Sequence, residues 1–187
     1  MSNCYSLQYL KKIGVNLLGS NIKISKYARI YNPKNLTIHD NVRIDDFTII
    51  SCKGKIEIYN NVHISAQCFI SSSTNIIIHS YSSISVGVKL FGSNDDYSGN
   101  FMANPTVPKQ FLNVTNGDII IEKHSIIGSN SVILPNITIA EGTAIGCQSF
   151  VNKPTDNWKI YAGSPIKYIK NRNRNCLVLE EEYKLLL

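Results

Sequence analysis

Branched aliphatic residues recur along most of the chain at a spacing of six. The positions that share this register are Ile38, Ile44, Ile50, Ile58, Ile64, Ile70, Ile78, Ile84, Leu90, Ile121, Ile127, Ile133, Ile139, Ile145 and Val151. The steps from Ile50 to Ile58 and from Ile70 to Ile78 are eight residues, so the pattern there repeats every 20 residues. The same register runs back to Ile30, Ile24 and Leu18, which predicts an incomplete turn before Ile38.

A six-residue period fits neither an amphipathic helix nor a long alternating strand. It fits short strands joined by corners, so that three strands form one coil of a triangular prism and every sixth side chain points to the axis. The residue two before each anchor should then point inward as well, into a tighter space. These residues are nearly all small or β-branched: Val42, Thr48, Val62, Cys68, Ser82, Val88, Ser125, Ser131, Thr143 and Ser149. The corners should need turn geometry or positive φ, which Asp40–Asn41, Asn60–Asn61, Gly128, Gly142 and Gly146 tolerate.

The irregularities of the repeat all fall at one corner. Both two-residue insertions and the long excursion from Phe91 to Asp118 leave between the third and the first side of a coil. A loop of that length inside a compact domain usually carries function. We therefore predict an all-β prism of about six turns over residues 18–170, with an active-site loop at 91–118. A short segment over 1–17 precedes it, and a tail over 171–187 should contain a helix from Leu177 to Leu187, where good helix formers gather.

Composition narrows the class of protein. Of 187 residues, 43% are hydrophobic and 17% charged, which excludes a wholly disordered chain. No apolar run approaches the length of a membrane-spanning helix and no secretory signal opens the chain, so we expect a cytoplasmic protein. Five cysteines without a close pair predict reduced thiols.

The net charge of +6 depends largely on one stretch of the chain. Its basic residues are Lys159, Lys167, Lys170, Arg172 and Arg174. They lack the aromatic interleaving of a single-strand nucleic-acid binder. A local anionic ligand therefore explains them better than a nucleic acid does.

The repeat, together with two further segments, resembles the hexapeptide-repeat acyltransferases over roughly residues 18–170. The loop Ser93–Gly99, followed by Asn104–Pro108, is similar to the active-site loop of the branch that acetylates bacterial surface sugars. The segment Ile160–Lys167 is similar to the ending at which the family holds coenzyme A. The resemblance implies a left-handed parallel β-helix, acetyl-CoA as co-substrate, and a homotrimer with active sites between subunits.

The resemblance also implies which residues would hold the coenzyme. Ser129, Cys147 and Asn152 would lie along its arm and adenine, and Lys153, Lys167 and Lys170 near its phosphates. A coenzyme with a 3′-phosphate and a pyrophosphate needs cations of this kind. The alternative is a solubilising basic tail after the last coil. Trp158 could cover the adenine or simply cap the prism.

Residues 91–118 contain no His, although many O-acetyltransferases of the family place one in this loop. Asn94, Asp95 and Asp96 occupy that part of the loop. A carboxylate is a poor base for a hydroxyl, whereas an amine is partly neutral and loses its proton only after attack. The two aspartates could act in this way or merely hold a turn. His79 is a second candidate base, since its corner should lie one turn below the loop.

Two other functions for such a prism can be tested on the sequence. A zinc site of the carbonic anhydrase kind needs three His around one ion, but His39 and His79 should lie two coils apart and the remaining two His fall elsewhere. We therefore expect no metal. An ice-binding face needs repeated small polar groups, and the outward positions are mixed.

We expect an acetyl-CoA-dependent N-acetyltransferase that acts on the amine of a nucleotide-linked deoxyamino sugar in surface-polysaccharide (O-antigen or capsule) biosynthesis. The alternatives are a sugar O-acetyltransferase with His79 as base and a non-catalytic β-helix binding protein.

Overall fold

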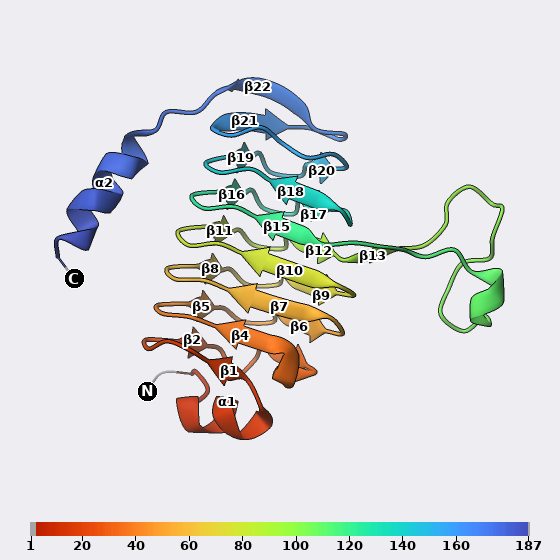
Figure 1. Ribbon diagram of the computed structural model, residues 1–187, viewed down its shortest axis with the longest axis horizontal. Coiled ribbons are helices and arrows are strands. Elements are labelled where there is room, and N and C mark those ends of the chain that lie inside the picture. The colour runs from red at the N-terminus through yellow and green to blue at the C-terminus, as the bar shows by residue number, and fades with distance from the viewer. Residues whose placement is uncertain (1–2, 187) are drawn as a thin grey trace.

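The computed structural model describes residues 3–186 and forms a β-solenoid of about seven turns with three parallel sheets (Figure 1). The first sheet contains β1 (Asn16–Leu17), β4 (Leu36–Ile38), β7 (Lys55–Ile58), β10 (Asn75–Ile78), β15 (Ile119–Ile121) and β18 (Ile137–Ile139). The second contains β2 (Lys23–Ile24), β5 (Arg43–Ile44), β8 (His63–Ile64), β11 (Ser83–Ile84), β16 (Ile126–Ile127), β19 (Ala144–Ile145), β21 (Lys159–Ala162) and β22 (Lys167–Asn171). The third contains β3 (Arg29–Tyr31), β6 (Ile49–Cys52), β9 (Phe69–Ser72), β12 (Lys89–Phe91), β17 (Val132–Ile133) and β20 (Phe150–Val151).

The interior of the solenoid confirms the hexad pattern. All fifteen predicted anchors are at most 3% exposed, and the ten tighter positions are at most 2% exposed. The hydroxyls at the tighter positions donate to carbonyl groups at the corners, as Thr48 does to Ser65 (2.9 Å) and Ser131 does to Gly146 (3.0 Å). Small polar side chains therefore fill a narrow space and satisfy backbone groups that would otherwise be unpaired.

The corners explain why the strands are so short. Asn21, Asn41, Asn61, Tyr81 and His124 occupy equivalent corners and all have positive φ, between 48° and 60°. Gly142 also has positive φ, as the sequence indicated, but Gly128 and Gly146 do not. Those two glycines are needed for another reason. A Cβ on Gly128 would lie 2.6 Å from the amide nitrogen of Cys147 in the next turn.

The first turn differs from the prediction by one residue. Leu17, rather than Leu18, pairs with Ile38, and Leu18 is 59% exposed. The segment before it contains α1 (Leu7–Ile13), which the hydrophobic pattern did not reveal. Ser6 caps α1 by accepting a hydrogen bond from the amide of Tyr9 (3.2 Å). The buried side chain of Leu10 closes this end of the core.

The other end is also more elaborate than expected. A seventh turn begins with β21, in which Tyr161, not an aliphatic residue, lies opposite Ile145. The chain then reverses, and β22 pairs antiparallel with β21. The C-terminal helix, α2, spans Asn175–Lys184, so it begins two residues before and ends three residues before the predicted bounds. Leu187, the last residue of the predicted helix, lies outside the described residues.

The long loop leaves the solenoid where it was expected. It departs after β12 and returns at β15, through a two-stranded antiparallel neck of β13 (Ser93–Asn94) and β14 (Thr115–Asn116). Two short 3-10 helices, η1 (Pro33–Asn35) and η2 (Lys109–Phe111), complete the elements, and η2 lies within the loop. The loop projects from one edge of the prism, whereas α2 lies beside another (Figure 1).

Candidate active site

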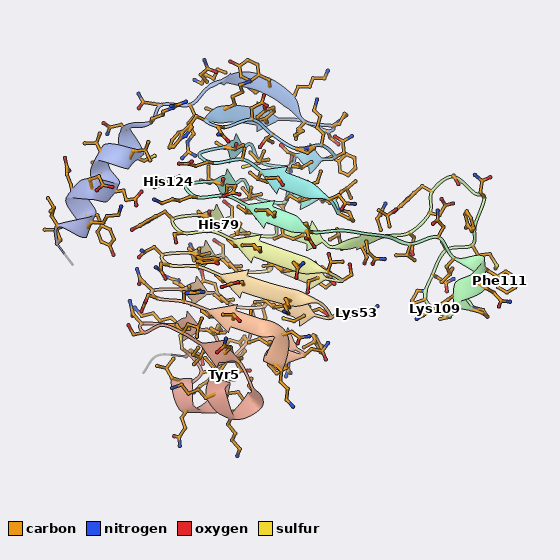
Figure 2. All side chains as sticks on the ribbon, viewed as in Figure 1. Tyr5, Lys53, His79, Lys109, Phe111 and His124 are labelled. Carbon is orange, nitrogen blue, oxygen red and sulfur yellow. The ribbon has the colours of Figure 1, made fainter. Side chains whose placement is uncertain are left out.

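A groove of about 610 Å³ lies between the projecting loop and the solenoid. Its polar lining comes from Lys53, Ser93, Asp95, Lys109 and Asn116. Its apolar lining comes from Pro105, Val107, Leu112 and Val114 of the loop. Figure 2 shows Lys53 at the solenoid edge and Lys109 on the loop facing it. The volume is in the range of ordinary small-ligand sites.

The three predicted loop residues take different positions. Asn94 belongs to the neck, where it is half-buried and lies opposite Thr115. Asp96 accepts hydrogen bonds from the hydroxyl of Ser98 (2.8 Å) and the amide of Gly99 (3.2 Å), so its carboxylate holds a turn. Asp95 is exposed to the groove. Of the two neighbouring aspartates, only Asp95 has a carboxylate placed to meet a ligand in this groove.

His79 lies away from the loop in the same chain, contrary to the expectation that it could reach it. It follows β10, at the opposite end of the first side from the corner where the loop leaves. Its ring stacks on Tyr59 with centroids 5.0 Å apart, and its Nε2 lies 3.7 Å from Glu122. The prediction failed because it placed His79 beside the wrong corner of its turn.

A second candidate surface runs down the corner between the second and third sides. Strand register stacks Ser85, Gly128, Gly146 and Ala162 in one column, directly after the inward residues of successive turns. Ser129 and the exposed Cys147 follow two of these residues at the same corner. These four residues have small side chains and are half-buried, which leaves room for an extended ligand along the column.

The remaining predicted coenzyme-binding residues lie at two different corners of the solenoid. Lys167 lies opposite Ala162 in the β21–β22 pair, at the head of this column, and Lys170 lies opposite Ile160. Both are exposed. Asn152 and Lys153 follow β20 at the next corner, also exposed. The fold therefore brings Ser129, Cys147 and Lys167 to one corner and places Asn152 and Lys153 at the other end of the third side.

Other members of the basic stretch have partners within the protein. Arg172 donates to the carbonyl groups of His124 (2.7 Å) and Gly142 (3.0 Å). The guanidinium of Arg174 lies 5.5 Å from the centre of the Trp158 ring. Trp158 itself is buried at a different corner, beside His124, where a Cβ on Gly142 would collide with its ring. These contacts favour capping of the solenoid as the role of Trp158.

A charged cluster that the sequence did not reveal fixes α2 to the solenoid. Glu180 lies 2.6 Å from Nε2 of His124 and 2.7 Å from Nζ of Lys123, and it also pairs with Lys184 (2.8 Å). Burial alone would raise the pKa of Glu180. The hydrogen bonds from Lys123, Lys184 and His124 outweigh burial and lower this pKa to about 2.

Two further findings bear on the kind of site. Among residues 3–186, no group of three or more His, Cys, Asp or Glu side chains could hold a metal ion. Within the same residues, no helix is both long and apolar enough to cross a membrane.

The solenoid, its projecting loop and the groove beside it are the parts of a β-helix acyltransferase. No protein-family model matches the chain. A dTDP-4-amino-4,6-dideoxy-D-glucose acyltransferase from Escherichia coli is 39% identical over 176 residues, which cover 94% of this chain and 92% of the relative. The chain therefore belongs to the hexapeptide-repeat β-helix acyltransferases, in the group that includes the dTDP-amino-sugar N-acyltransferases.

Solved structures agree with this assignment. AntD, an N-acyltransferase from Bacillus cereus, was solved as a serine variant with dTDP-4-amino-4,6-dideoxyglucose and coenzyme A. That structure has a TM-score of 0.95 and 41% identity, and the match covers 100% of both chains. A complex of AntD with dTDP and 3-hydroxybutyryl-CoA gives a TM-score of 0.94 and 43% identity over 98% of this chain and 97% of the other.

Sequence reasoning missed Lys53 and Lys109 as groove residues. Lys53 lies in one of the two-residue insertions, and the repeat had already placed these insertions on the edge from which the loop leaves. Lys53 could therefore have been identified from the sequence, as a cation on the edge from which the loop leaves. Lys109 carried no such signal, because the path of the loop is not encoded in the repeat.

Proposed function

We propose that this protein transfers an acyl group from acyl-CoA to the 4-amine of dTDP-4-amino-4,6-dideoxyglucose. The observation that carries the proposal is the similarity over nearly the whole chain to enzymes whose names and complexes contain this sugar nucleotide. The groove beside the loop supports it, because Asp95 offers a carboxylate to an amine there. Such a reaction belongs in the cytoplasm, in the supply of a surface polysaccharide.

The reaction needs little from the protein beyond orientation and removal of one proton. The neutral amine attacks the thioester carbonyl carbon, a C–N bond forms, and the C–S bond then breaks to release the coenzyme thiolate. Asp95 orients the amine and takes its proton, and a proton finally reaches the thiolate. Backbone N–H groups near the site would stabilise the oxyanion. An imidazole is not required for this step.

The position of Ser85 supports a homotrimer with shared active sites. The AntD variants replace a serine and an aspartate ten positions later, the same spacing as Ser85 and Asp95 here. In one chain Ser85 lies before β12, at the start of the third side, whereas Asp95 lies in the loop beyond the far end of that side. A neighbouring copy could bring its Asp95 against Ser85. The exposed aromatic side chains of Tyr27 and Phe47 also leave apolar surface for a neighbour.

Coenzyme A would lie along the small-residue column that ends near Ser85. Ser129 and Cys147 would line its arm, with Lys167 and Lys170 near its phosphates at the head of the column. Asn152 and Lys153 would contribute from the next corner. Replacing Lys167 and Lys170 together by Glu should raise KM for acyl-CoA at least about tenfold, since charge-assisted phosphate contacts are lost. An unchanged KM would remove β22 from the coenzyme site.

Acetyl is the acyl group we propose, because it is the group that the family resemblance implies. The complex of AntD with 3-hydroxybutyryl-CoA makes that longer group the natural competitor. Competition between the two thioesters at equal concentration, with products separated by mass, decides between them. A product carrying mainly hydroxybutyryl would show that the acetyl assignment is wrong.

A substrate panel tests the function itself. Thymidine- and uridine-linked 3-amino and 4-amino sugars, with the corresponding hydroxyl sugars as controls, are incubated with acetyl-CoA and 3-hydroxybutyryl-CoA while thiol release is recorded. We expect the thymidine-linked 4-amino sugar to give the highest kcat/KM. Turnover of hydroxyl sugars alone would instead favour O-acylation, and no turnover at all would favour a binding protein.

A further inference from the structure

Three charged side chains line the groove: Lys53, Asp95 and Lys109. No ion pair within residues 3–186 involves Lys53, Asp95 or Lys109. The two lysines approach from different parts of the fold. Lys53 stands in the corner between β6 and β7 of the solenoid, and Lys109 begins η2 in the loop. Both line the same cavity as Asp95.

This arrangement of charge is complementary to an amino-sugar nucleotide. A sugar diphosphate carries two negative charges at neutral pH, and its protonated amine carries one positive charge. The groove offers two cations and one carboxylate. The remaining wall is apolar, from Val107, Leu112 and Val114, and suits the methyl groups of thymine and of a 6-deoxy sugar.

We propose that Lys53 and Lys109 clamp the diphosphate of the sugar nucleotide from opposite walls of this groove. The inference rests on the proposed function and adds to it the residues that recognise the nucleotide. Because one lysine is on the solenoid and the other on the loop, a bound diphosphate would bridge two elements that the chain connects through the β13–β14 neck. The nucleotide would thus hold the loop against the solenoid while Asp95 meets the amine.

Binding of dTDP, measured by titration calorimetry on the full chain without any thioester, tests the clamp. Lys53→Gln and Lys109→Gln should each weaken dTDP binding about tenfold, and the double variant by more than either. Lys55→Gln is the matched control, because Lys55 is an exposed lysine two residues from Lys53 that does not line the groove. Lys53→Arg should retain binding within about threefold, since it preserves the charge.

Kinetics and ionic strength separate a phosphate clamp from a general effect of charge. KM for the sugar nucleotide should rise in the Gln variants, while KM for acyl-CoA stays unchanged. The dependence of dTDP affinity on salt should become weaker in the double variant, because fewer ionic contacts are formed. Hydrogen exchange in residues 95–114 should slow when dTDP binds to the natural protein and not when it binds to the double variant.

The outcomes also distinguish this inference from the proposed function. Active acylation with unchanged dTDP affinity in both Gln variants would overturn the clamp and leave the function intact. Loss of dTDP affinity in a protein that acylates no amino sugar would support the clamp and overturn the function. Equal weakening by Lys55→Gln would also overturn the clamp, because only overall charge would then matter.

Discussion

Two clusters of charged side chains lie on different edges of the same prism, and their surroundings are opposite. At the α2 edge, Glu180 is buried and each of its neighbours Lys123, His124 and Lys184 lies within 2.8 Å of it. At the loop edge, Lys53, Asp95 and Lys109 are exposed to a groove. Figure 2 places His124 beside α2 and Lys109 on the distant loop.

This contrast separates the charges that stabilise the fold from those that remain available to a ligand. A buried charge is tolerated only when it is paired, so the cluster around Glu180 must be internally complete. Such a cluster attaches a helix and leaves no capacity for a substrate. Charges that face solvent across a groove cost little in the free protein and keep their hydrogen-bonding capacity for an incoming ligand. The following changes test this division of roles.

Replacement of Asp95 by Asn should have the largest effect. We expect kcat to fall about 10²–10⁴-fold, the usual contribution of a positioned acid–base group, with the melting temperature unchanged. Asp96→Asn is the matched control, because that carboxylate holds the turn with Ser98 and Gly99. It should alter kcat less than about tenfold. If both variants retain full activity, the loop edge does not contain the base.

Replacement of Glu180 by Ala should weaken the attachment of α2 to the solenoid without lowering kcat. It leaves the buried His124 ring without its hydrogen-bonding carboxylate, and an unsatisfied buried polar group costs about 1–3 kcal/mol. The loss should appear as faster hydrogen exchange in α2, while kcat measured on the folded protein stays close to normal. Glu181→Ala is the control, since Glu181 is exposed and its one ion pair among residues 3–186 is with Lys184. Equal exchange in the two variants would mean that Glu180 does not attach α2.

Lowering the pH should weaken the attachment of α2, because it protonates Glu180. The pKa of Glu180 is lowered in the folded protein from 4.5 to about 2. Its contribution is therefore fully present above about pH 4.5 and is lost as pH falls toward 2, by at most roughly 3.5 kcal/mol at about 1.4 kcal/mol per pKa unit. Unfolding free energies of the natural protein and of Glu180→Gln should converge between pH 5 and pH 2. Parallel curves over that range would contradict the assignment.

The repeat could be predicted from the sequence because one physical requirement recurs in every turn. An axis position takes Ile, the tighter position two residues earlier takes a small or β-branched residue, and no long-range information is needed. The departures occur where that requirement is absent. Leu17 replaces Leu18 at the end of the stack, Tyr161 replaces an aliphatic residue in the last turn, and α1 depends on capping rather than on the hexad.

The site was less predictable, because it combines residues that the repeat does not place. Asp95 could be found, since it lies in a loop whose exit corner the hexads define. Its division of labour with Asp96 depends on one turn of that loop, and Lys109 depends on how the loop folds back. Glu180 joins His124 across 56 residues, through a helix whose docking no local pattern encodes.

Replacement of His79 by Asn should have the smallest effect on kcat. It tests whether a catalytic residue lies away from the loop edge. The ring of His79 packs between Tyr59 and Glu122, at the end of β10 remote from the loop corner. An N-acyltransferase needs no imidazole, so His79→Asn should change kcat less than about threefold. An O-acyltransferase that used this imidazole would lose about 10²–10⁴-fold. His39→Asn is the control for packing, because His39 stacks on the other face of Tyr59. A large loss of kcat in His79→Asn alone would assign the catalytic role to His79 instead of Asp95.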